Sequence, residues 1–190
     1  MATHALNFTA RLAFTVALFT AGQAVAAADD LVALVLHVDN YARIPSAHLA
    51  RAEAVVTRIY AASGVRVVWV NGDAPAEPAP GHLRVLLLCA DMSAHKVRLD
   101  NVPDNVLGQA AKGAGRAHIF TIRVRDIAIA RAQDFDLVLG RVMAHEVGHL
   151  LLPSHSHSAA GIMRESLDLG TRRFETFTPA QGSQLQLALR

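Results

Sequence analysis

The sequence of 190 residues has little cysteine and no large excess of charge of either sign. Its single cysteine, Cys89, excludes a disulfide within the chain, and this residue is expected to be a small buried hydrophobe. The 18 basic residues nearly balance the 16 acidic ones, so the net charge gives no reason to expect a nucleic-acid partner. With 52% hydrophobic and 18% charged residues, the composition also excludes an intrinsically disordered chain.

The first 28 residues have the layout of a secretory signal peptide. Arg11 precedes a short apolar run, Leu12–Phe19, and the alanine-rich stretch that follows offers small residues for cleavage. The apolar run is shorter than the roughly 20 residues that a membrane-spanning helix needs, and Gly22 and Gln23 interrupt it. We therefore expect residues 1–28 to be removed, which predicts a secreted or periplasmic protein without a stable membrane anchor.

Residues 29–190 are expected to form one α+β domain, because no internal repeat or second boundary is visible. A helix that Ser46 can cap is predicted to end before Gly64, and the glycine- and proline-interrupted stretch 91–115 is predicted to consist of long loops with at most one helical turn. Four apolar runs are predicted to be strands: 31–38, 65–70, 83–89 and 117–124.

Two further helices have clear start signals. The first is predicted to begin at Asp134 or Asp136, either of which can cap it, and to run to about Leu152, where Pro153 stops it. This helix is apolar almost all round, so it should be buried. The second follows Thr178, which is succeeded by proline and by a glutamine at the capping-box position.

The buried helix carries the pattern His145-Glu146-Val147-Gly148-His149. Two histidines four residues apart emerge from the same face of a helix and can share one metal ion. Glu146 lies beside them, where a carboxylate can act as general base in metal-assisted hydrolysis. A glutamate in so apolar a helix costs several kcal/mol unless a partner compensates it, and Zn²⁺ is a suitable partner.

A third protein ligand is needed for a catalytic zinc site, and it must come from downstream. His155 lies six residues after His149, and Met163 ends the turn Gly161-Ile162-Met163. In these features the sequence resembles the metzincin superfamily of zinc peptidases, whose HExxHxxGxxH pattern precedes a Met-turn. The resemblance implies a minimal metzincin-like domain: a mixed four-stranded sheet, a buried zinc-binding helix, a Met-turn at Met163 and a C-terminal helix.

One residue departs from that pattern and leaves the third ligand open. Leu152 stands where metzincins have the glycine that turns the chain sharply out of the helix. A helix prolonged through Leu152 favours the later His157, which begins the segment His-Ser-Ala-Ala-Gly-Ile-Met, similar to the HSxxGIM segment of small bacterial metzincin-like proteins. His157 is therefore the favoured third ligand, and His155 is the alternative.

The resemblance implies a zinc-dependent endopeptidase that uses a zinc-bound water activated by Glu146. We expect a monomer that acts on a peptide or protein substrate, with the strand 117–124 as the edge strand that binds the extended peptide. No tyrosine follows Met163, so assistance by a tyrosine near the metal, as in astacin-like members, is not expected. The alternative is a zinc-binding module that keeps the metzincin fold without catalysis, because the motif does not separate the two.

Overall fold

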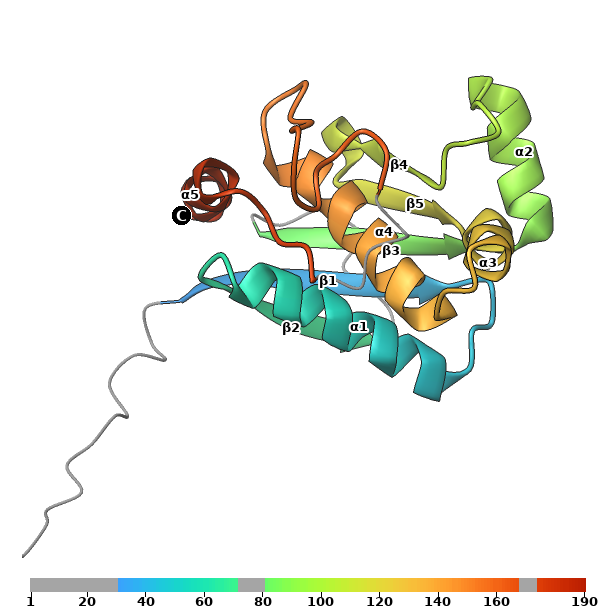
Figure 1. Cartoon of the computed structure of the whole chain (residues 1–190), viewed down its shortest axis with the longest axis horizontal. Coiled ribbons are helices and arrows are strands. Elements are labelled where there is room, and N and C mark those ends of the chain that lie inside the picture. The colour runs from blue at the N-terminus through green and yellow to red at the C-terminus, as the bar shows by residue number, and fades with distance from the viewer. Residues whose placement is uncertain (1–30, 72–80, 168–173) are drawn as a thin grey trace, which may run out of the picture. The chain divides into compact units, whose positions relative to one another are not determined.

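The computed structural model describes residues 31–71, 81–167 and 174–190 and contains one sheet with helices around it (Figure 1). Leu31–Arg190 forms one compact unit, and the predicted signal peptide, residues 1–28, lies outside the described residues. In the described part of the chain, no helix has the length and apolar character needed to cross a membrane. In chain order the elements are β1 (Val32–Asn40), α1 (Ser46–Ala61), β2 (Val65–Asn71), β3 (His82–Leu88), α2 (Ala90–Asp100), β4 (Gly108–Ala111), the 3-10 helix η1 (Lys112–Ala114), β5 (Arg116–Phe120), α3 (Thr121–Ala130), α4 (Phe135–Leu151) and α5 (Pro179–Ala188).

The sheet is mixed and has the strand order β2-β1-β3-β5-β4. The first four strands in that order are parallel, and β4 runs antiparallel to β5, with Gly108 opposite Ile119. The α+β class and the mixed sheet are therefore confirmed, but the sheet has five strands rather than four. The predicted edge strand is wrong as well, because β5 lies between β3 and β4, and β4 forms the edge.

The core lies between the sheet and two helices. Along β1, Leu34, Leu36 and Val38 are buried, as expected when alternate side chains of a strand face the core. Helices α1 and α4 cover this face side by side (Figure 1). Gly140 permits their close approach, because a Cβ there would lie 2.6 Å from the Ala52 carbonyl oxygen of α1.

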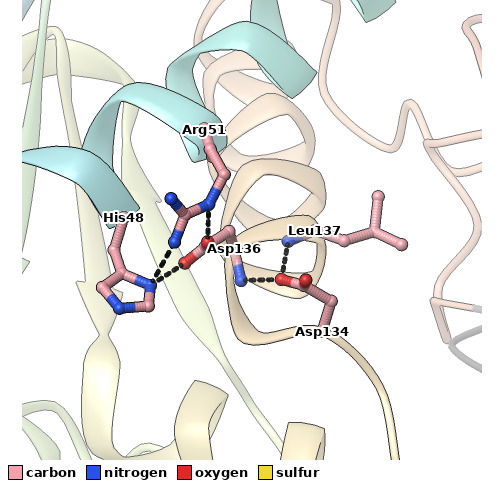
Figure 2. Close-up of polar contacts among 5 residues, drawn as sticks. All are labelled: His48, Arg51, Asp134, Asp136 and Leu137. Atoms are coloured by element: carbon pink, nitrogen blue, oxygen red, sulfur yellow. Dashed lines mark hydrogen bonds and ion pairs between the residues drawn. The ribbon is translucent and has the colours of Figure 1, made fainter.

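The start of α4 is fixed to α1 by polar contacts (Figure 2). Asp134 is the N-cap, and its carboxylate accepts hydrogen bonds from the backbone N–H groups of Asp136, at 2.8 Å, and Leu137, at 3.4 Å. The buried carboxylate of Asp136 lies 2.7 Å from His48 Nδ1 and 2.5 Å from Arg51 Nε, both on α1. These contacts set the position of the helix that carries His145 and His149.

Several predicted elements have different boundaries in the structure. The stretch 91–115 contains α2, β4 and η1, not only loops. Helix α2 escapes detection because it buries only Ser93 and so has no apolar stripe. The predicted strand 117–124 divides, with β5 ending at Phe120 and α3 starting at Thr121. Helix α1 starts at Ser46 itself, without a side-chain cap. The first residues of α3 include β-branched types, which favour strands. In the structure, the Thr121 hydroxyl donates to the Leu88 carbonyl oxygen at 2.7 Å, and this contact holds the start of the helix at the end of β3.

Cys89 is half-buried at the start of α2, so the expectation of a fully buried residue is wrong. The C-terminal helix α5 has the predicted start. The Thr178 hydroxyl accepts the backbone N–H of Gln181, at 3.3 Å, and the Gln181 side-chain oxygen accepts the backbone N–H of Thr178, at 3.1 Å. Both halves of the predicted capping box are thus confirmed.

Candidate metal centre

His145 and His149 lie one turn apart on α4, as their spacing predicts. Their Nε2 atoms are 3.0 Å apart. His145 Nδ1 donates to the Ile162 carbonyl oxygen at 2.8 Å, because a carbonyl can only accept. The neutral imidazole of His145 therefore has its proton on Nδ1 and a free lone pair on Nε2, the atom that faces His149.

The chain leaves α4 without a left-handed residue at Leu152. Leu152 is extended, with φ −79° and ψ 160°, and its side chain is fully buried. A residue before proline prefers the extended conformation. Pro153 therefore ends the helix, as predicted, at the point where the metzincin pattern has a glycine. The turn follows at His155, whose φ is 59°.

This exit brings His157 to the pair and leaves His155 outside it. His157 Nε2 lies 3.1 Å from His149 Nε2, and the ligand atoms of His145, His149 and His157 all lie within 4.8 Å of one another. In the described part of the chain, these three form the one group of three or more histidine, cysteine or acidic residues that can hold a metal ion. His155 is exposed and does not belong to the group.

The donor set fits zinc. Burial first, and then the neighbouring His145 and His157, lower the pKa of His149 to about 4, and burial also lowers the pKa of His145. Both rings are therefore neutral at neutral pH, which is the form that binds metal. The three Nε2 atoms cannot all satisfy one another by hydrogen bonds, because the His145 proton lies on Nδ1 and His149 Nε2 can either donate to His145 or accept from His157, but not both. A three-histidine set with a place left for water is a known catalytic zinc arrangement.

Met163 packs against α4 at Gly148, which lies between the two helical histidines in the sequence. It is fully buried, and a Cβ added to Gly148 would lie 2.6 Å from its sulfur. Gly148 stands directly before His149, and the absence of a side chain at Gly148 lets Met163 pack against this turn of α4. The neighbouring Ile162 carbonyl orients His145, as described above.

Glu146 points toward the edge strand. It is buried, and burial raises the pKa of its carboxyl to about 8, while a backbone hydrogen bond from Ala110 of β4 acts in the opposite direction. Gly108 makes room for it, because a Cβ at Gly108 would lie 2.5 Å from Glu146 Cγ. The glutamate thus packs against the backbone of β4 and lines the same cavity as the three histidines, and a nearby cation would lower its pKa again.

A cavity of about 770 Å³ opens onto these residues. Its walls come from α4, from α3, from the segment Asp104–Gly108 that leads into β4, and from Glu165–Leu167. Arg123 of α3 fixes one wall, since it donates to the carbonyl oxygens of Pro103, at 2.7 Å, and Val106, at 2.8 Å. The space is large enough for side chains of a bound peptide.

The structure thus brings together Glu146, His145, His149, His157 and Met163. Two supporting residues were missed by the sequence interpretation. Gly108 was taken for a loop residue, and nothing in the sequence shows that it faces Glu146. Gln181 was recognised only as a capping residue, although its side chain also contacts the loop that carries His157.

No family model matches the sequence, and no curated protein sequence matches it. Among solved structures, the fold is similar to that of a zinc-dependent peptidase from Methanocorpusculum labreanum (strain Z). The two chains are 16% identical, with a TM-score of 0.51, and the match covers 80% of this chain and 99% of the other. At this level of identity the likeness shows a shared fold and nothing about activity.

Proposed function

We propose that this chain is an exported, zinc-dependent endopeptidase of the metzincin type. The observation that carries the proposal is the convergence of three histidine Nε2 atoms beside a buried glutamate at the edge of the sheet. The shared fold with a zinc-dependent peptidase supports the same conclusion. Export is inferred from the signal-peptide pattern of residues 1–28.

His145, His149 and His157 would hold the metal, and Met163 would take the part of the Met-turn methionine. Zinc, when bound, supplies Lewis acidity that polarises a peptide carbonyl and makes water a nucleophile at neutral pH. The Ile162 carbonyl keeps the His145 proton on Nδ1, and the Ser156 hydroxyl lies 3.2 Å from His149 Nδ1. These contacts orient the two rings with Nε2 toward the shared centre.

Glu146 would move the protons. Its carboxylate accepts a proton from the attacking water and then donates it to the amine that leaves when the peptide bond breaks. Burial against β4 suits this exchange, because a carboxyl group whose pKa is raised by desolvation holds a proton more readily than an exposed one. The backbone N–H of Ala110 keeps one carboxylate oxygen oriented.

The substrate would bind as an extended strand along β4. This strand is the edge of the sheet, and it lies beside Glu146 and the cavity that contains the histidines. A peptide added to an edge strand gains backbone hydrogen bonds whatever its side chains are. The cavity walls then select among side chains.

The substitution Glu146→Gln tests the proposal. It removes the proton acceptor but keeps the size of the side chain and all three histidines. We expect peptide cleavage to fall by roughly 10²–10⁴-fold, with about one zinc still bound per chain. Cleavage of a mixed-peptide library and metal analysis are the measurements, with and without a chelator.

Glu165→Gln is the matched control, because Glu165 is exposed in the same cavity and has no proposed part in the reaction. It should retain cleavage. A wild-type protein that binds zinc but shows no chelator-sensitive cleavage would instead establish the non-catalytic zinc-binding module. Full hydrolysis by the Glu146→Gln variant would exclude Glu146 as the base.

A further inference from the structure

Gln181 connects the C-terminal helix to the metal-binding loop. Its side chain is buried, with 7% of its surface exposed, at the first turn of α5. The amide nitrogen donates to the Ser156 carbonyl oxygen at 2.9 Å, and it lies 3.2 Å from the Ser158 hydroxyl. The amide oxygen accepts the backbone N–H of Thr178. One side chain therefore serves the helix start with its oxygen and the loop with its nitrogen.

The two residues that Gln181 contacts flank His157. Unlike His145 and His149, His157 is exposed and lies outside any helix or strand, so its position depends on how the loop backbone is held. The Ser158 backbone N–H donates to the Met163 carbonyl oxygen at 2.9 Å, which fixes the loop on one side. Gln181 fixes it on both sides of the histidine.

The choice of glutamine at this position is informative. A capping box works with glutamate as well as with glutamine, because only the side-chain oxygen is used there. The contacts with Ser156 and Ser158 need the amide N–H₂, which glutamate lacks. The helix start alone therefore does not require glutamine, whereas the contact with the loop does.

We propose that Gln181 is a positioning residue for the third metal ligand, His157, and that it sets the zinc affinity of the site. The inference rests on the metal-binding part of the proposed function and does not depend on peptidase activity. Groups that orient metal ligands typically change metal affinity by 10–100-fold when they are replaced. Gln181 acts through the loop backbone, so we expect the lower end of that range.

The substitution Gln181→Glu separates the two roles of the side chain. It keeps the capping oxygen but replaces the donor with a carboxylate oxygen that faces the Ser156 carbonyl. Gln184→Glu is the matched control, because it makes the same chemical change at an exposed position of the same helix, about one turn closer to the C-terminus. Zinc affinity is measured by competition with a chromophoric chelator, and the electronic spectrum of the cobalt(II)-substituted protein reports on the ligand set.

We expect Gln181→Glu to bind zinc about tenfold more weakly than wild type, with altered cobalt(II) absorption and an unchanged helical signal in the metal-free protein. Gln184→Glu should match wild type in all three measurements. If Gln181→Glu does not fold, Gln181→Met replaces it, since it removes the donor without adding a charge; it also removes the capping oxygen, so the helical signal of the metal-free protein must match wild type for its zinc affinity to be compared.

Zinc affinity of the folded variant within twofold of wild type would overturn the inference, as would an equal loss in Gln184→Glu. Either result leaves the proposed function standing, because wild type still binds zinc. A wild-type protein that binds no zinc would overturn the proposed function, and the inference with it.

Discussion

Replacing Gly108 with alanine should disable Glu146 while leaving the metal ligands in place. The added Cβ would lie 2.5 Å from Glu146 Cγ and 2.9 Å from both Cδ and Oε1. Ordinary contacts between carbon atoms are about 3.5–4.0 Å, so the shortfall is about 1 Å. Strand β4 cannot easily retreat, because it pairs with β5 and the Leu107 carbonyl oxygen accepts the Phe120 N–H at 3.0 Å. The glutamate side chain must therefore rotate away.

The size of the effect follows from this displacement. A misplacement of about 1 Å in a catalytic group can cost about 10²-fold in rate, and overpacking a buried site costs about 1–3 kcal/mol of stability. We expect Gly108→Ala to lose about 10²-fold in kcat for a fluorescence-quenched peptide substrate. Its zinc content should equal that of wild type, because no histidine lies against the new methyl group among the nearest atoms.

Gly113→Ala is the matched control, since a Cβ at Gly113 meets no atom within 4 Å. This variant should retain both activity and stability, measured by urea unfolding. If Gly108→Ala cleaves the peptide at nearly the wild-type rate, then the position of Glu146 against β4 does not matter for the reaction. The reasoning that places the proton acceptor there would be refuted.

Two further predictions concern the helix that carries the histidines and its end. Leu152→Gly introduces the glycine of the metzincin pattern, but it removes a fully buried leucine side chain from a residue that is extended rather than left-handed. We therefore expect the free energy of unfolding in urea to fall by about 3–5 kcal/mol and the zinc affinity not to increase. Tighter zinc binding would contradict this reasoning. In the metal-free protein, His149 resists protonation when folded, since its pKa is lowered from 6.5 to about 4, so the unfolded chain takes up the proton first as the pH falls. The contribution of His149 to the free energy of unfolding is therefore complete above pH 6.5 and is lost toward pH 4, while the raised pKa of Glu146 acts in the opposite direction in both proteins. The free energy of unfolding of wild type relative to that of His149→Leu, measured by urea unfolding, should therefore decrease between pH 6.5 and pH 4; an equal pH dependence in the two proteins would count against the reasoning.

The sequence predicts best the elements whose signals are local. Thr178 caps α5 and Asp134 caps α4 through contacts within a few residues, so the residue types identify Thr178 and reduce the cap of α4 to Asp134 or Asp136. The spacing of His145 and His149 is equally local, because one helical turn sets it. These features also define the most informative part of the site.

Features that depend on contacts between distant segments could not be predicted. Gly108 looks like a loop glycine until β4 is seen against Glu146, 38 positions later in the chain. The end of α4 at Leu152 follows from Pro153 and was predicted, but the turn at His155, where φ is 59°, is not marked by a residue type that favours it. The first four residues of α3, 121–124, were assigned to a strand because their β-branched side chains favour strands when tertiary contacts are ignored.

The position of α4 in the chain has a consequence for how the protein folds. All five strands precede it, and their buried face shares one core with α4 residues such as Leu139, Met143 and Val147. Before α4 is in place, much of the apolar side of the sheet therefore lacks its cover. Parallel strand pairing is slow and exposes apolar surface to aggregation. The helix that covers this face of the sheet also carries the first two histidines, so we expect a chain that stops short of α4 to lack both a stable fold and a metal site.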